Sequence, residues 1–270
     1  MWRADLYARY ITYDTLDDLD GLRVLIAPMC LTLPEHVAKA IATFVDAGGV
    51  LIGEARMGLY DDRGYNQPVL PSGILARVVG AAEQEAVCSD PQNRPVLNNP
   101  RGEQWPDPIH NGPEISFTEP TSASVRARGY LCPLTLTEGR SIAHCLGHTL
   151  AVANNYGHGT AYYFGTYLGL ALAEDDAGSL SIIQSLLERH TAPHVRGSAL
   201  RPRWIDAGDE ALLAVFNDSR QETHQEQIRL PKSYAKAYNV YDKREVRIDD
   251  QSLQVEVEPE SVCIILVTDK

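Results

Sequence analysis

The sequence predicts an α/β protein of two domains, a three-layer domain over residues 1–193 and a small antiparallel β-sandwich over residues 194–270. Two apolar segments, at residues 22–27 and 50–53, are too short for globular helices and predict strands buried on both faces. A helical pattern lies between them, so the order is typical of a βαβ unit with parallel strands and a right-handed crossover. The remaining sequence predicts strands separated by turns, and it becomes wholly β-rich after Pro193.

The helix between the two strands has clear signals at both ends. Thr32 and Glu35 stand at the spacing of a capping box, and Pro34 is suited to a first helical turn. Gly48 and Gly49 predict its end, because glycine adopts the left-handed conformation that closes helices. The apolar residues that recur on one face of this helix are Val37, Ala40, Ile41, Phe44 and Val45.

Four further segments complete the expected first domain. Residues 10–13 predict an edge strand, and a short helix is expected from Ser72 to Val79, where Gly80 ends it. Glycine turns divide residues 123–167 into successive hairpin strands. Leucine and isoleucine at helical spacing predict a helix over residues 177–190.

A segment with six prolines, residues 90–113, is expected to be a long surface loop. Loops of this length inside a domain are uncommon and are often functional or interfacial. Trp105 and Ile109 give the segment apolar side chains to bury, which favours an interface.

The bulk composition excludes several function classes. The net charge of −12 disfavours nucleic-acid and anionic-membrane partners, and there is neither a signal peptide nor an apolar run long enough to span a membrane. Five scattered cysteines without pairing are typical of reduced thiols. We therefore expect a cytoplasmic protein without cofactors.

The candidate binding site lies where the two parallel strands end, since open sheets place their ligand crevice at that edge. Cys30 follows the first strand, Glu54 and Arg56 follow the second, and Asp61 and Asp62 lie in the next loop. A salt-bridged loop at a subunit contact is the structural alternative for this cluster. Cys30 lacks the glycine neighbours of a nucleophile elbow, so a packed thiol is its default interpretation.

No metal site is predicted. His144, His148 and His158 lie in the hairpin region, but neither helical spacing nor a cysteine pair supports zinc ligation. No phosphate-binding or dinucleotide-binding glycine motif is present either, and the tyrosines of residues 156–167 fit a core and an interface better than a sugar platform.

The chain resembles the family 42 β-galactosidases in their non-catalytic part. The segments that carry the resemblance are residues 22–64, 70–81, 159–169, 212–219 and 262–267. In that family a catalytic barrel is followed by a trimerisation domain, similar in fold to flavodoxin and class I glutamine amidotransferases, and by a small β-sandwich. The resemblance therefore implies a flavodoxin-like domain and self-association as a homotrimer.

The barrel itself has no counterpart in this sequence. A (β/α)8 barrel needs about 250 residues, and the two carboxylates of a retaining glycosidase, which the family carries on its barrel, have no place here. We therefore expect no catalytic residue and an accessory, oligomerising role in carbohydrate metabolism, inactive alone. Two alternatives stay open: a small-molecule binder or hydrolase using the crevice near Cys30, and the tail subunit of a split β-galactosidase whose barrel is a separate chain.

Overall fold

The computed structural model describes residues 8–13, 19, 21–84, 86–88, 112–191, 195 and 197–269. The chain divides into two compact units, one of Ile11–Thr191 and one that includes Ala192–Lys270. The proline-rich loop with Trp105 and Ile109 lies outside the described residues, apart from its last two positions.

A βαβ unit opens the larger unit as the sequence predicts. β1 (Val24–Ala27) pairs in parallel with β2 (Val50–Glu54), and α1 (Glu35–Asp46) connects them. Gly48 ends α1 in the left-handed region with φ +111°, as expected. The prediction of a capping box is wrong, because Pro34 is the N-cap and no side chain caps the helix.

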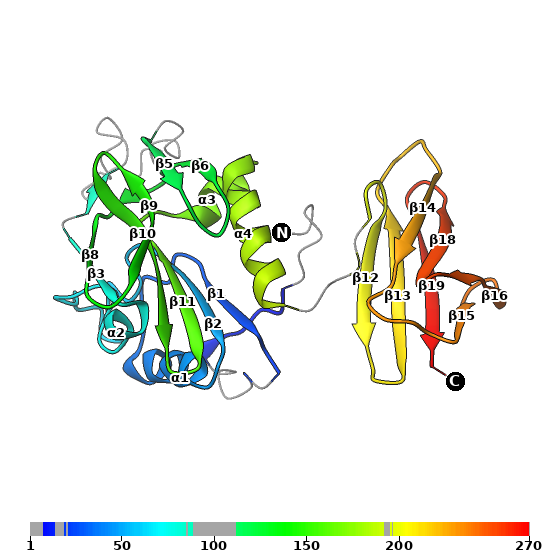
Figure 1. Ribbon diagram of the computed structural model, residues 1–270, viewed down its shortest axis with the longest axis horizontal. Helices are drawn as coiled ribbons and strands as arrows, with labels where there is room; N and C mark the ends of the chain where they lie inside the picture. Colours follow the sequence, from blue (N-terminus) through cyan, green and yellow to red (C-terminus); the bar gives the residue numbers. More distant parts are fainter. Residues whose placement is uncertain are drawn as a thin grey trace. The chain divides into compact units, whose positions relative to one another are not determined.

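The sheet that grows from this unit is mixed and mainly antiparallel (Figure 1). Its seven strands run in the order β1-β2-β11-β10-β9-β5-β6. β11 (Gly159–Phe164) continues the parallel part beside β2, and every later pairing is antiparallel. The other strands are β5 (Glu114–Phe117), β6 (Ala123–Arg126), β9 (Arg140–Cys145) and β10 (His148–Tyr156).

The predicted three-layer, flavodoxin-like α/β fold is therefore wrong. About 41% of the residues that the structure describes are in strands and 17% in helices, and the sheet curls into a half-barrel. After the βαβ unit the described strands of this sheet, apart from β11 beside β2, pair antiparallel, whereas a doubly wound sheet adds each parallel strand through a helical crossover. The expected strand at residues 10–13 is also absent, since these residues form none.

Helices lie against both faces of the strands nearest the centre. α1 and α2 (Leu75–Val79) share a core with Tyr163, whereas the neighbouring Tyr162 bonds His190 of α4 (Ala177–His190) at 2.9 Å. Successive residues of β11 thus point to opposite faces. The remaining elements are α3 (Leu168–Ala173) and the short pairs β3 (Ala81–Glu83) with β8 (Leu134–Leu136) and β4 (Val87–Cys88) with β7 (Tyr130–Leu131).

The smaller unit contains two antiparallel sheets around one core. One has the order β12-β13-β19-β15-β16 and the other β14-β18-β17. Alternate residues such as Leu213 and Val215 of one sheet, and Leu253 and Val255 of the other, are buried together. The strands are β12 (Arg201–Asp206), β13 (Glu210–Asn217), β14 (His224–Arg229), β15 (Lys236–Asn239), β16 (Arg244–Val246), β17 (Ile248–Asp249), β18 (Ser252–Val257) and β19 (Ser261–Thr268).

Candidate functional site

The end of β2 places Glu54 in the interior rather than in an open crevice. Its side chain is only 3% exposed, and it accepts hydrogen bonds from the backbone N–H of Gly169 at 2.6 Å and of Met29 at 3.2 Å. Burial raises the pKa of this carboxyl to about 7, against the opposing effect of the two N–H donors. Glu54 thus joins the loop after β1 to the start of α3.

Arg56 belongs to a second buried polar cluster, whose centre is Glu83. The backbone N–H of Arg56 donates to Glu83 Oε1 at 2.6 Å, and its guanidinium Nη1 donates to Oε2 at 3.2 Å. Tyr163 donates its hydroxyl to Oε1 at 2.5 Å, and the Glu83 side chain is 1% exposed. The guanidinium also lies 5.8 Å from the ring centroid of Tyr130.

Sequence reasoning missed the central role of Glu83. It lies at the end of β3, 27 residues from Arg56 and 80 from Tyr163. The available signal was a charged residue close to an apolar helix, three residues after Gly80. Because β3 pairs with β8 and not with β2, the approach of Glu83 to Arg56 depends on a loop path that periodicity does not encode.

Cys30 is half-buried and has no features of a nucleophile. Its Sγ lies 3.6 Å from the hydroxyl of Tyr13, which also donates to the carbonyl oxygen of Thr32. Burial raises the pKa of the Cys30 thiol, and the Tyr13 contact opposes this only in part. A raised pKa leaves little thiolate at neutral pH, which is the reverse of what a catalytic cysteine needs.

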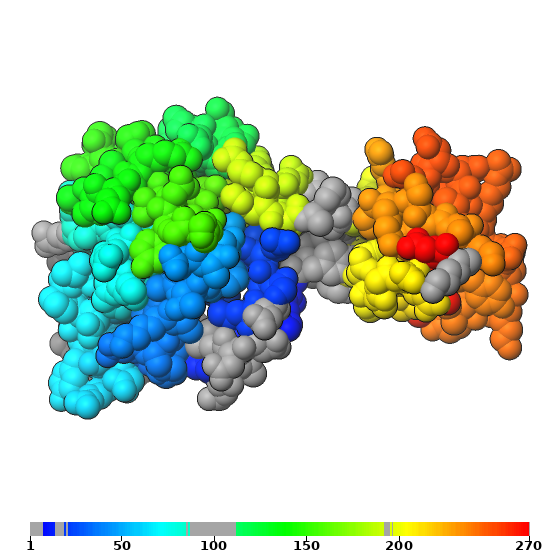
Figure 2. Space-filling model, turned by 60° about the horizontal axis from the view of Figure 1, so that its bottom comes forward, coloured from blue at the N-terminus to red at the C-terminus, as the bar shows by residue number. Residues whose placement is uncertain are grey.

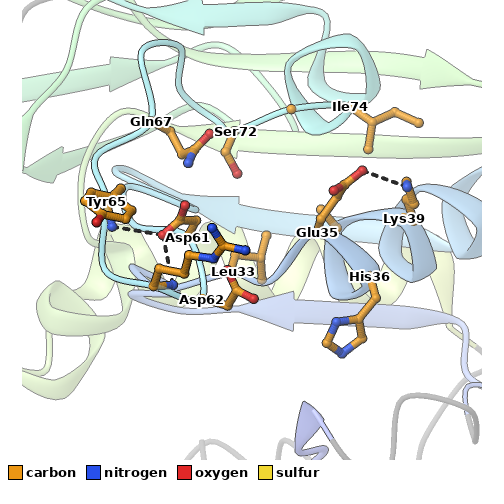
Figure 3. Close-up of a pocket in the computed structure, with 13 residues that line it drawn as sticks. Leu33, Glu35, His36, Lys39, Asp61, Asp62, Tyr65, Gln67, Ser72 and Ile74 are labelled. Atoms are coloured by element: carbon orange, nitrogen blue, oxygen red, sulfur yellow. Dashed lines mark hydrogen bonds and ion pairs between the residues drawn. The ribbon is translucent and has the colours of Figure 1, made fainter.

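Asp61 and Asp62 lie apart from that interior, on a polar cavity of about 530 Å³ (Figure 3). The first turns of α1 contribute Glu35, His36 and Lys39 to its wall. Asp61 Oδ1 accepts from the backbone N–H of Arg63 at 2.9 Å and of Tyr65 at 2.8 Å, so this carboxylate shapes its own loop.

Further along the chain, Gln67, Ser72 and Ile74 close the cavity. The structure thus separates the predicted binding residues into two groups. Glu54 and Arg56 are part of the interior, Cys30 lies near Glu54's partner Met29, and only the two aspartates line an open space.

The two buried carboxylates have structural partners within the chain. Glu54 and Glu83 are almost inaccessible to solvent, and they accept hydrogen bonds from Gly169 and Tyr163 respectively. A retaining glycosidase needs two carboxylates that both reach the sugar.

Within the described ranges, no three His, Cys, Asp or Glu side chains form a group that could hold a metal ion. No described helix is both long and apolar enough to cross a membrane.

Comparisons with known proteins give one match to a protein family and several to solved structures. The family model for the β-galactosidase trimerisation domain matches residues 1–192. A comparison with curated proteins gives no match.

Three solved β-galactosidases share the fold at low sequence identity. A catalytic mutant of a GH42 β-galactosidase from G. stearothermophilus has a TM-score of 0.71 at 17% identity, over 99% of this chain and 34% of that one. The enzyme from Bacillus circulans sp. alkalophilus has a TM-score of 0.68 at 16% identity, with 93% and 34% covered. The enzyme from Rahnella sp. R3 has a TM-score of 0.65 at 18% identity, with 92% and 33% covered.

The chain spans about a third of the length of these structures, and at such identities they show the fold alone. The family match is the stronger finding, because it covers well over half of the sequence. It also confirms the resemblance drawn from the sequence segments. The chain belongs to the family of β-galactosidase trimerisation domains.

Proposed function

We propose that residues 1–193 form a self-association domain that assembles a homotrimer, and that residues 194–270 form an accessory all-β domain. The match of residues 1–192 to the trimerisation family is the single observation that carries this proposal. The internal use of Glu54 and Glu83 supports a role without glycosidase activity of its own. A cytoplasmic location stays a prediction from the sequence.

Exposed apolar side chains on two adjoining loops support a specific contact surface. Met29, Tyr65 and Val69 are 43%, 68% and 50% exposed. Their loops are joined by backbone hydrogen bonds from Tyr60 N to Leu31 O at 2.9 Å and from Leu33 N to Tyr60 O at 3.0 Å. We call Met29, Tyr65 and Val69 the loop-pair surface. In Figure 2 the blue and cyan segments that contain these loops adjoin on the visible face of the larger unit.

The mass of the purified chain in solution tests the assembly. Light scattering after size exclusion is expected to give about three times the 29.8 kDa of one chain. The double variant Tyr65→Asp/Val69→Asp places two charges on the loop-pair surface and should shift the mass towards one chain, because burying unpaired charges is costly. A monomeric wild type would overturn the proposal.

Leu146→Asp is the matched control for these substitutions. Leu146 is 78% exposed at the turn between β9 and β10, away from the loop pair in the sequence. The control should stay trimeric. Equal disruption by the control would show that charge anywhere on the unit dissociates it and would remove the loop-pair surface from the proposal.

Catalysis by the whole assembly requires a barrel from elsewhere, either another part of the polypeptide or a separate chain. The coverage of only 34% of the GH42 enzyme supports this division. The purified chain should release no nitrophenol from a nitrophenyl β-galactoside, and co-purification with a barrel chain would identify a split enzyme. A small-molecule or hydrolytic role at Cys30 is the weaker alternative. Slow labelling of Cys30 by iodoacetamide would exclude the reactive thiol that this alternative needs.

A further inference from the structure

A second hollow lies wholly within the smaller unit, at one end of its five-stranded sheet. Its volume is about 730 Å³, which is in the range of ~300–1,000 Å³ typical of small-molecule sites. Three separate connections line it: the loop after β13 with Asp218 and Arg220, the turn before β19 with Glu260, and the turn after β15 with Tyr241. Antiparallel pairing of β13 and β15 with β19 brings these connections to the same end.

The lining combines apolar surface with a charged rim. Phe216 and Val262, which are paired across β13 and β19, contribute apolar surface. Tyr241 is 63% exposed, so its ring is open to a ligand. Asp218, Arg220 and Glu260 provide acceptors and donors, and Asp218 is also paired with Arg201 at 2.5 Å. The negative charges of Asp218 and Glu260 equal the positive charges of Arg201 and Arg220, and this neutrality disfavours a strongly charged ligand.

The rim groups are available because their mutual contact is weak. Arg220 Nε lies 3.7 Å from Glu260 Oε1, beyond the length of a good hydrogen bond, and the two side chains are 88% and 68% exposed. An exposed pair of this kind contributes little to stability. A ligand could therefore separate Arg220 from Glu260 at little cost in free energy.

The backbone under the rim, by contrast, is firmly held. Asn217 Oδ1 accepts from the N–H of Ser219 at 2.9 Å, and the Ser219 carbonyl accepts from the N–H of Glu260 at 3.0 Å. Asn239 Oδ1 accepts from the N–H of Tyr241 at 3.0 Å. The backbone of the lining therefore needs little ordering on binding, and only the exposed rim side chains lose conformational freedom.

Glu260 itself occupies a position where glycine would be less costly. Its φ is +50°, in the left-handed region that non-glycine residues rarely adopt. Non-glycine residues held in this region are found preferentially at functional sites. The same conformation occurs at Leu146 and Lys243 in other turns, so here it serves to place the Glu260 carboxylate on the rim of the hollow.

We propose that this hollow binds a neutral sugar. A pyranose has flat faces of C–H groups, which suit the Tyr241 ring and the apolar lining, and hydroxyls that both donate and accept. Carboxylates and a guanidinium match neighbouring hydroxyl pairs with directed hydrogen bonds. The site would thus hold carbohydrate without cleaving it, and it is independent of the assembly proposed for residues 1–193.

Saturation-transfer difference NMR on the full chain tests this directly, with methyl β-galactoside and methyl β-glucoside as probes and inorganic phosphate in a parallel titration. At least one glycoside should receive saturation, and calorimetry should give its affinity. Tyr241→Ala should weaken binding by about tenfold or more, since a central aromatic contact is lost. Tyr238→Ala is the matched control, because Tyr238 is 40% exposed in the same hairpin and does not line the hollow.

Glu260→Gly separates binding from folding. Glycine relieves the left-handed backbone, so the thermal midpoint should stay the same or rise, while sugar binding is lost. Three outcomes would each overturn the proposal: no saturation transfer to either glycoside, equal loss in Tyr238→Ala and Tyr241→Ala, or displacement of the bound glycoside by phosphate. Unchanged binding in Glu260→Gly would also contradict it.

Discussion

At the residue scale, the Glu54 carboxyl predicts a distinct pH dependence of stability. Its pKa rises from 4.5 to about 7 on folding, so the folded state binds more protons between these values. The free energy of unfolding should therefore fall as pH rises from about 4.5 to 7, by up to ~3 kcal/mol for this group alone. Glu54→Gln should remove that part of the slope in urea unfolding at pH 5, 6, 7 and 8.

Glu35→Gln is the control, because Lys39 at 2.7 Å lowers the pKa of the exposed Glu35 and its titration lies below this window. If wild type and Glu54→Gln kept a constant difference in unfolding free energy from pH 5 to 8, the raised pKa would be refuted.

A second residue-scale prediction concerns the buried cluster around Glu83. Glu83→Ala leaves the Arg56 guanidinium, the Arg56 N–H and the Tyr163 hydroxyl without their acceptor. Removing one partner of a buried pair typically costs ~3–5 kcal/mol. Glu119→Ala, which breaks an exposed pair with Arg140, should cost less than ~1 kcal/mol in the same urea titration. Equal losses in the two variants would show that Glu83 is not a structural centre.

At the element scale, the hairpin between β10 and β11 attaches the antiparallel strands to the βαβ unit. The N–H of His158 donates to the Asp46 carbonyl at the end of α1, at 2.9 Å. A Cβ on Gly159 would lie 2.2 Å from the carbonyl oxygens of Val45 and Gly49, which are backbone atoms that cannot move aside cheaply. Glycine at this position permits the close contact.

Gly159→Ala should therefore destabilise the unit by more than ~2 kcal/mol, a loss of the kind that strain in a packed backbone produces. Gly208→Ala is the comparison, because its Cβ would meet open space and only the φ of +86° opposes it, a cost of about 1 kcal/mol. Thermal unfolding measures both. A smaller loss of stability in Gly159→Ala than in Gly208→Ala would show that the hairpin can move away from α1.

Local signals predicted the βαβ unit and the helix over residues 177–190, whereas the pairing of distant strands decided the fold class. The helix Ala177–His190 is confirmed over its full length, and β1, α1 and β2 follow the apolar periodicity. The sequence does not reveal that β11 lies in parallel beside β2 although an antiparallel hairpin leads into it. Alternation is the same for either direction of pairing, so periodicity cannot choose between them.

The candidate site shows the same limit. The sequence predicts one polar binding site at the edge of β1 and β2, but burial separates Glu54 and Arg56 from the open cavity at Asp61 and Asp62. A local sequence pattern does not distinguish a buried carboxylate that accepts backbone hydrogen bonds from an exposed carboxylate that could bind a ligand.

At the scale of the whole molecule, the family match ends at residue 192, where the C-terminal part of the smaller unit, Ala192–Lys270, begins. If residues 1–193 carry assembly, then damage to the core of the smaller unit should leave the mass unchanged. Leu213 is fully buried in that core, and Leu213→Ala should cost ~2–5 kcal/mol of local stability. Calorimetry should show a lowered transition for this unit, and light scattering below that temperature should still give the mass of three chains. A monomeric Leu213→Ala would place part of the interface in residues 194–270 and would refute the division of labour proposed for the two domains.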